Sequence, residues 1–174
     1  LYAWQSLKFQ RRWTTPYIGI VRKGNMIKAF FQTDNSINNF ITRILLGIVI
    51  FPHGAQKLLG WFGGHGLDGT LNFFTHQLEL PMIVAVLIIL GESLGALGLM
   101  VGFLTRFCAA GILITMGGAT VMFHSSNGFF MNWSGKQGGE GFEYHLLAIA
   151  LCLPLIISGG GRFSADRFIA KQSF

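Results

Sequence analysis

The sequence predicts an all-α protein, a four-transmembrane-helix bundle with both termini cytoplasmic. Composition is the first indication. Of the 174 residues 51% are hydrophobic and 11% are charged, and 24 are glycine, a balance typical of membrane proteins. The second indication is that the apolar residues gather in four runs, three of which approach the roughly 20 residues that a helix needs to cross a bilayer.

The positive charges orient this bundle. Eleven of the 13 lysines and arginines fall on the side of both termini, and only Lys57 and Lys136 fall on the other. Cytoplasmic segments carry the excess of Lys and Arg, so both termini of this multi-pass protein are expected in the cytoplasm. Five of the 13 precede Met26, which leaves eight cations against seven acids in the rest of the chain. That balance excludes a nucleic-acid partner and favours the lipid bilayer.

The chain divides into three parts. Residues 1–39 form a basic, aromatic N-terminal tail, which either lies on an anionic membrane surface or reflects an over-extended start, with Met26 as the alternative. Residues 40–166 form the membrane domain, and residues 167–174 form a cytoplasmic C-terminal tail.

The first predicted helix covers residues 40–59 and follows three candidate N-cap residues, Asp34, Asn35 and Ser36. Pro52 removes one backbone hydrogen bond and is expected to kink it. Just beyond, His53, Gln56 and Lys57 are spaced i, i+3 and i+4, which places all three on one helix face.

A glycine-rich loop over residues 61–80 leads to the second span, residues 81–104. Glycines recur there every three or four residues, a small-residue stripe that lets membrane helices approach closely: Gly91, Gly95, Gly98 and Gly102. Glu92 lies alone near the middle of this span. An isolated carboxylate at that depth either stays protonated or pairs with a cation, for which Lys57 and Arg106 are the candidates.

The third span covers residues 107–123 and ends at His124; a second long loop, residues 125–141, follows. The last apolar run, residues 146–157, is too short to cross a bilayer. Its helix must therefore begin near Phe142, which draws Glu143 and His145 to the membrane edge. These two residues lie on nearly opposite helix faces, so only one of them can point inward strongly.

The topology brings polar residues at the ends of three helices to one level on the outer side of the membrane. Glu92 lies deeper in the membrane, and the two long loops cover this polar group: His53, Gln56, Lys57, His124, Glu143 and His145.

Two of the ionisable residues have a second interpretation. Lys57 can simply extend its ammonium to the interface, and Glu92 can serve a structural pair. Arg106, on the cytoplasmic side, is expected to anchor its helix.

Several kinds of chemistry are disfavoured. His53, His124 and His145 raise the question of haem ligation, but their spacing is a weak signal. The sequence has no metal-binding motif, and Cys108 and Cys152 lie singly in apolar runs as packing thiols. The segments GGHGLDG and GKQGGEG lack the spacing of a phosphate loop and are expected to form turns.

Four segments, RILLGIVIFPHGAQKLLGWFGGHGLDGT, GESLGALGLMVGFLTR, HSSNGFF and GFEYHLL, resemble the DoxX family of small four-helix membrane proteins, in the family's order. The resemblance covers roughly residues 40–166. It implies an inner-membrane protein whose relatives serve as membrane subunits of thiosulfate:quinone oxidoreductase or of thiol-oxidative-stress complexes. The matching motif positions are His53, Gln56, Lys57, Glu92 and Glu143. The family often has Asn where this chain has His145.

Together these features predict a quinone-associated redox membrane subunit. Glu92, Lys57 and Glu143 are the expected catalytic residues, and the expected quinone-binding residues are His53, Gln56, Lys57 and His124. Because the sequence shows no redox centre, electrons must come through a redox partner protein or a diffusible quinone, and catalysis by the chain itself stays open. A membrane scaffold or assembly factor is the alternative. A small-solute permease would require a homo-oligomer, since four helices leave little room for a path.

Overall fold

The computed structural model describes residues 30–172, so the predicted start at Met26 and most of the N-terminal tail lie outside it. All regular structure in the described part is helical. The long helices are α2 (Ile37–Leu59), α4 (Met82–Val101), α5 (Thr105–Ala119) and α6 (Glu143–Ser158). The short elements are η1 (Trp61–Gly63), α3 (Gly66–Asn72), η2 (Phe73–Gln77), η3 (Thr120–His124), η4 (Ser125–Asn127) and α7 (Ala165–Gln172).

Three helical stretches are long and apolar enough to cross a membrane: α2, α4, and α5 continued through η3 and η4. Helix α6 is a shorter apolar helix of 16 residues. It begins at Glu143, next to the start expected near Phe142. The predicted all-α membrane bundle is confirmed.

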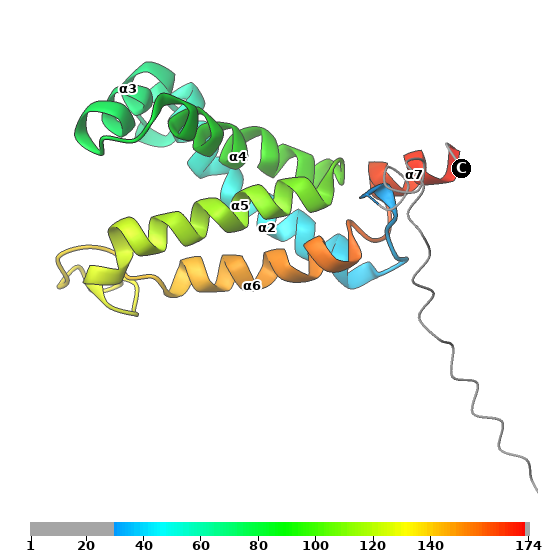
Figure 1. The fold of residues 1–174 in the computed structure, drawn as a ribbon. Helices are drawn as coiled ribbons and strands as arrows, with labels where there is room; N and C mark the ends of the chain where they lie inside the picture. Colours follow the sequence, from blue (N-terminus) through cyan, green and yellow to red (C-terminus); the bar gives the residue numbers. More distant parts are fainter. Residues whose placement is uncertain (1–29, 173–174) are drawn as a thin grey trace, which may run out of the picture.

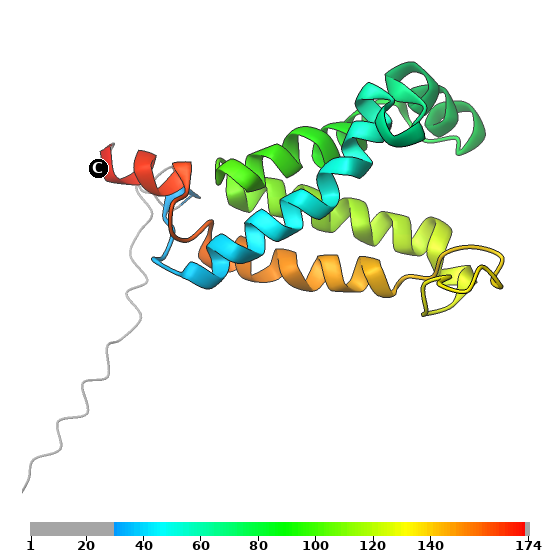
Figure 2. The same ribbon diagram turned by 180° about the vertical axis from the view of Figure 1, so that it is seen from behind.

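The four long helices form two pairs, α2 with α4 and α5 with α6 (Figure 1). The pairs lie together at one end and diverge at the other, as both views show (Figure 2). We call the first the termini end, because residues 30–36 and α7 lie there. The other is the loop end, which carries residues 60–81 and 120–142. Residues 167–172, which the sequence assigned to a tail, lie in α7.

All four long helices contribute to one apolar core. Other apolar residues of the same helices face outward and suit contact with lipid chains. The buried residues of the core are Leu46, Ile50, Ala96, Leu99, Ala109, Ile112, Met116, Ala148, Cys152 and Leu155. Burial of Cys152 agrees with its predicted role as a packing thiol, and both cysteines are free.

Local signals set the ends of α2. The Ser36 hydroxyl accepts a hydrogen bond from the backbone N–H of Asn39, as an N-cap does. At the other end Gly60 adopts a left-handed φ of 72°, which glycine tolerates without a Cβ clash. The helix continues through Pro52, so His53 and Lys57 belong to the same helix as the core residues Leu46 and Ile50.

The segment 61–80 differs from the predicted loop, because α3 and the π-helical turn η2 occupy much of it. Its glycines argued against helix, and Gly60, Gly63 and Gly66 do form turns with positive φ. Beyond them Phe74 packs against Ala85 and Ile89 of α4. Burial of that apolar face stabilises a helical segment whose local propensity is poor.

The predicted glycine stripe of α4 is used only at its termini end. A Cβ on Gly98 would lie 2.6 Å from the Cys108 sulfur, whereas one on Gly91 would meet nothing closer than 3.6 Å. The closest approach between helices comes from α2 instead. A Cβ on Gly54 would lie 2.3 Å from the backbone oxygen of Glu92, so the two backbones touch there.

Candidate functional site

An ion pair between Lys57 and Glu92 joins α2 to α4 in the loop-end half of the bundle. The Lys57 Nζ lies 2.5 Å from Oε2 of Glu92. The Glu92 side chain is 6% exposed and that of Lys57 is 24% exposed. Of the two cations considered for Glu92, Lys57 is therefore the partner. A charge pair at this depth is costly to desolvate, which makes its presence informative about the site.

Backbone contact explains why these two side chains meet. Gly54 sits directly against the Glu92 backbone, and Lys57 follows it by three residues, about one helical turn. The ammonium also lies 3.5 Å from the His53 carbonyl, the acceptor one turn earlier in its own helix. The Lys57 side chain therefore points toward the N-terminal part of α2 and toward α4, and its ammonium does not extend to the membrane interface.

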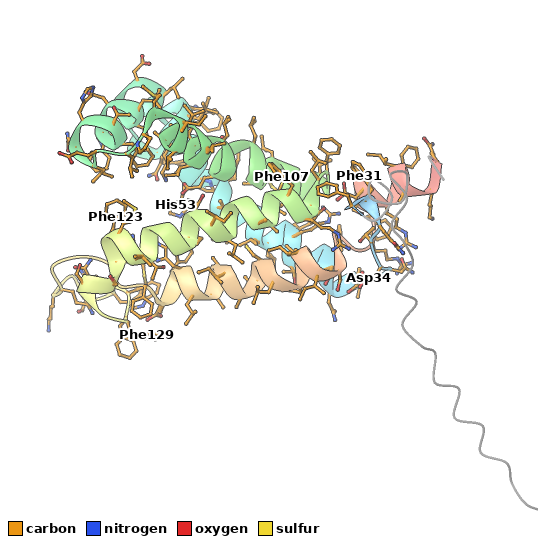
Figure 3. The ribbon with its side chains drawn as sticks, in the orientation of Figure 1. Phe31, Asp34, His53, Phe107, Phe123 and Phe129 are labelled. Atoms are coloured by element: carbon orange, nitrogen blue, oxygen red, sulfur yellow. The ribbon has the colours of Figure 1, made fainter. Side chains whose placement is uncertain are left out.

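A row of aromatic and imidazole rings continues from His53 across α6 to the end of η3. We call His53, Tyr144, His145 and His124 the ring row. Its successive ring centroids are 5.9 Å, 5.4 Å and 4.1 Å apart. His53 lies one helical turn before Lys57 on α2, and its carbonyl is 3.5 Å from the Lys57 ammonium, so the row begins beside the ion pair. Figure 3 shows His53 in the angle between the two diverging helix pairs.

Two polar atoms of the ring row are buried without a hydrogen-bond partner among residues 30–172: the Tyr144 hydroxyl and Nδ1 of His145. The His145 side chain is well enclosed, with the residue 7% exposed. Buried polar groups are normally paired, so two unpaired ones side by side indicate a place where a polar ligand or water binds. At the far end of the row, Nδ1 of His124 lies 2.8 Å from the Glu140 carbonyl.

Two of the residues selected from the sequence form hydrogen bonds with neighbouring loop segments. Oε2 of Glu143 accepts a hydrogen bond from the Met131 backbone N–H and so fastens the loop 128–142 to the start of α6. Gln56 donates to the Phe62 carbonyl and holds the turn after α2. Of Glu143 and His145, it is His145 that points inward. The structure thus brings together Lys57, Glu92, His53 and His124, and adds Tyr144 and His145.

The termini end holds a polar network that sequence analysis did not identify. Arg43, 1% exposed, donates hydrogen bonds to the carbonyls of five residues, two at the end of α4 and three in the connection between α6 and α7: Leu99, Met100, Gly160, Arg162 and Phe163. The Asp166 carboxylate accepts from the backbone N–H groups of Leu104 and Thr105 at 2.7 Å and 2.8 Å, which caps α5. The position of Arg43 inside the apolar run of residues 40–59 could have indicated a buried polar network. In the sequence analysis this arginine served only as a positive charge on the cytoplasmic side.

Arg106 has the anchoring role expected of it. Its guanidinium donates to the carbonyls of Ile156 and Ile157 at the end of α6, and to that of Gln32. A cation at a helix C-terminus also interacts favourably with the helix dipole. Both arginines therefore tie helix ends together, and neither is near Glu92.

Within residues 30–172, the structure contains no group of three or more His, Cys, Asp or Glu residues arranged to hold a metal ion. The ion pair and the ring row together provide hydrogen-bond donors and proton-carrying groups: one ammonium, one carboxylate, one phenol and three imidazoles. Such a set can orient a polar head group and move protons to or from it.

Comparison with known proteins gives a consistent result. The DoxX family model matches residues 39–125, half of the chain. The Bacillus subtilis (strain 168) protein "Putative oxidoreductase CatD" is 29% identical over 136 residues, covering 78% of this chain and 89% of that protein. The Escherichia coli (strain K12) "Inner membrane protein YqjF" is 29% identical over 136 residues, covering 76% of this chain and 92% of that protein. No solved structure matches the chain significantly.

Proposed function

The chain belongs to the DoxX family and is a multi-pass protein of the inner membrane, and we propose that it is a quinone-associated redox membrane subunit acting with a partner protein. The observation that carries this proposal is the buried Lys57–Glu92 pair beside the ring row. The name of the Bacillus relative, "Putative oxidoreductase CatD", supports the same reaction class.

A quinone fits the donor set of this site. Its head group presents carbonyl oxygens that accept hydrogen bonds, and the ammonium of Lys57 and the imidazole of His53 are donors of the right kind. The unpaired Tyr144 hydroxyl is a further donor in the same cluster. The surrounding helices are apolar on their outer faces, which suits an isoprenoid tail.

The residues of this chain would bind and orient the head group and hold protons near it, while a partner exchanges electrons with it. Glu92 keeps Lys57 in place and carries a negative charge that a proton can neutralise. His53 is exposed toward the angle between the helix pairs, so a ligand can approach it from the lipid side. The quinone itself supplies the two-electron chemistry that none of these side chains can perform.

Lipid-extract mass spectrometry of the purified protein tests the proposal. Wild-type protein is expected to retain quinone, and Lys57→Met and Glu92→Gln are each expected to lower the retained amount at least about tenfold, roughly one lost charge-assisted hydrogen bond. Lys136→Met and Glu79→Gln are matched controls, because both residues are exposed and away from the site. They should retain quinone as wild type does.

Folding must be followed in the same samples by circular dichroism and thermal unfolding. Wild-type protein without quinone would contradict the proposal. If Lys57→Met and Glu92→Gln lose quinone only in proportion to lost folded protein, the pair is structural and the scaffold alternative is favoured.

A further inference from the structure

We propose that Tyr144, His145 and His124 form a proton path from the Lys57–Glu92 site to the aqueous phase at the loop end. This inference rests on the proposed quinone function and deepens it, because it states through which residues and on which side the protons are exchanged. It is carried by the ring row and by its two unpaired buried atoms.

The exit of the path is defined by His124. A carbonyl oxygen can only accept a hydrogen bond, so Nδ1 of His124 carries the hydrogen in its 2.8 Å contact with the Glu140 carbonyl. The other ring nitrogen, Nε2, then has a free lone pair in the neutral imidazole. His124 can therefore accept a proton at Nε2 while it carries one at Nδ1 on the loop side, and loop-end water is the acceptor to which the imidazolium releases a proton.

His145 and Tyr144 supply the inner part of the path. The His145 ring lies 4.1 Å from that of His124, measured between centroids, and 5.4 Å from that of Tyr144. Nδ1 of His145 and the Tyr144 hydroxyl are free of partners among the described residues. Both groups can accept a proton and donate one, and ordered water is the bridge that the path requires between them.

A carboxylate route is not favoured by the geometry. Glu143 is the acidic residue of α6 nearest the row in sequence, but its Oε2 is held by the Met131 N–H. Glu140 contacts the row through its carbonyl, while its Oε2 accepts from the Asn132 N–H. The Glu143 and Glu140 side chains thus fasten the loop 128–142, and imidazoles form the connection.

The path accounts for the proton balance of the reaction. Reduction of a quinone to the quinol consumes two electrons and two protons, and each carbonyl oxygen gains one O–H bond. In the test below, reduced soluble mediators supply the two electrons in place of the partner protein. The protons enter from the loop-end aqueous phase through His124, and quinol oxidation would release them along the same residues.

The test uses the full chain in lipid nanodiscs with its retained quinone, reduced at an electrode through soluble mediators. Proton uptake is followed with a pH dye and quinone reduction by ultraviolet absorbance. His124→Gln is expected to slow proton-coupled reduction about 100-fold per bound quinone, the range of one general acid–base group. Imidazole added to the buffer should restore much of the rate. Tyr144→Phe removes only the hydroxyl and should slow the reaction without affecting folding.

His76→Gln is the matched control, since His76 is an exposed histidine of the same end that lies outside the ring row; it should behave as wild type, with no response to imidazole. Nitrogen-15 NMR of quinone-free protein gives a readout independent of turnover, in which His124 should be the Nδ1–H tautomer.

Three outcomes would overturn the path: a wild-type rate per bound quinone in His124→Gln, a wild-type rate in Tyr144→Phe, or a slow rate in His124→Gln that imidazole does not restore. If NMR shows the Nε2–H tautomer of His124, then His124 is not the loop-end exit of the path. Absence of quinone from wild-type protein is a different result, because it removes the proposed function and the path with it.

Discussion

Lys57 and Glu92 are 35 positions apart in the chain, yet their side chains meet at 2.5 Å in a part of the bundle where charge is costly. The contact depends on Gly54, which lets the backbones of α2 and α4 touch beside it. The ion pair, the helix contact and the start of the ring row therefore form one unit. A change in any of them is expected to affect the others.

The pair itself should be strongly coupled. Lys57→Met leaves a buried carboxylate without its cation and is expected to lower the free energy of unfolding by about 3–5 kcal/mol. Glu92→Gln added to Lys57→Met should recover part of this loss, because the uncompensated charge is removed. A double-mutant cycle in detergent, followed by thermal or denaturant unfolding, measures the coupling. Additive effects would show that the two residues act separately.

Gly54→Ala should separate α2 from α4. The added Cβ would lie 2.3 Å from the Glu92 backbone oxygen, which cannot move without its helix. We expect a loss of about 1–3 kcal/mol in unfolding free energy and weaker quinone retention. Gly111→Ala is the control, because a Cβ there meets nothing within 4 Å; it should be neutral or stabilising by up to ~1 kcal/mol. Equal destabilisation by both changes would refute the close helix contact.

Arg43 should be needed for stability at the termini end. Arg43→Met leaves several buried carbonyls without a donor, and we expect a loss of about 3–5 kcal/mol. Arg43→Lys should recover only part, because an ammonium cannot reproduce the planar set of donors. Arg162→Lys, at an exposed arginine, is the control and should change the melting temperature little. A fully stable Arg43→Lys protein would show that charge alone matters.

The orientation in the membrane can be tested by labelling. With Cys108 and Cys152 replaced by Ser, a cysteine at Ser134 should react with an impermeant maleimide in intact spheroplasts, since the loop end is expected outside. A cysteine at Gln172 should react only after permeabilisation. Both positions are exposed, so the reverse pattern would mean that the bundle is inserted in the opposite direction.

Much of the fold could be predicted because hydrophobicity is a local property. The apolar runs located all four long helices, and the length of the last run correctly required a start near Phe142. The helix in residues 66–72 was missed since its glycines are poor helix formers, and only burial of neighbouring Phe74 against α4 stabilises it.

Part of the site could also be predicted. Spacing along α2 placed His53 and Lys57 on one face, and a lone mid-span carboxylate required a partner. Tyr144 was not selected, because a tyrosine near a helix start is ordinary at a membrane interface. Its unpaired hydroxyl becomes visible only when the surrounding helices are in place.

The sequence alone determined that this protein is a helical membrane bundle and which ionisable residues lie at its loop end, because hydropathy and helical period depend on nearby residues only. The tertiary structure decided which of them meet. Lys57 rather than Arg106 pairs with Glu92, and His145 rather than Glu143 points inward. These choices depend on where Gly54 allows contact and on how α6 is rotated about its axis, and both result from packing between segments far apart in the chain.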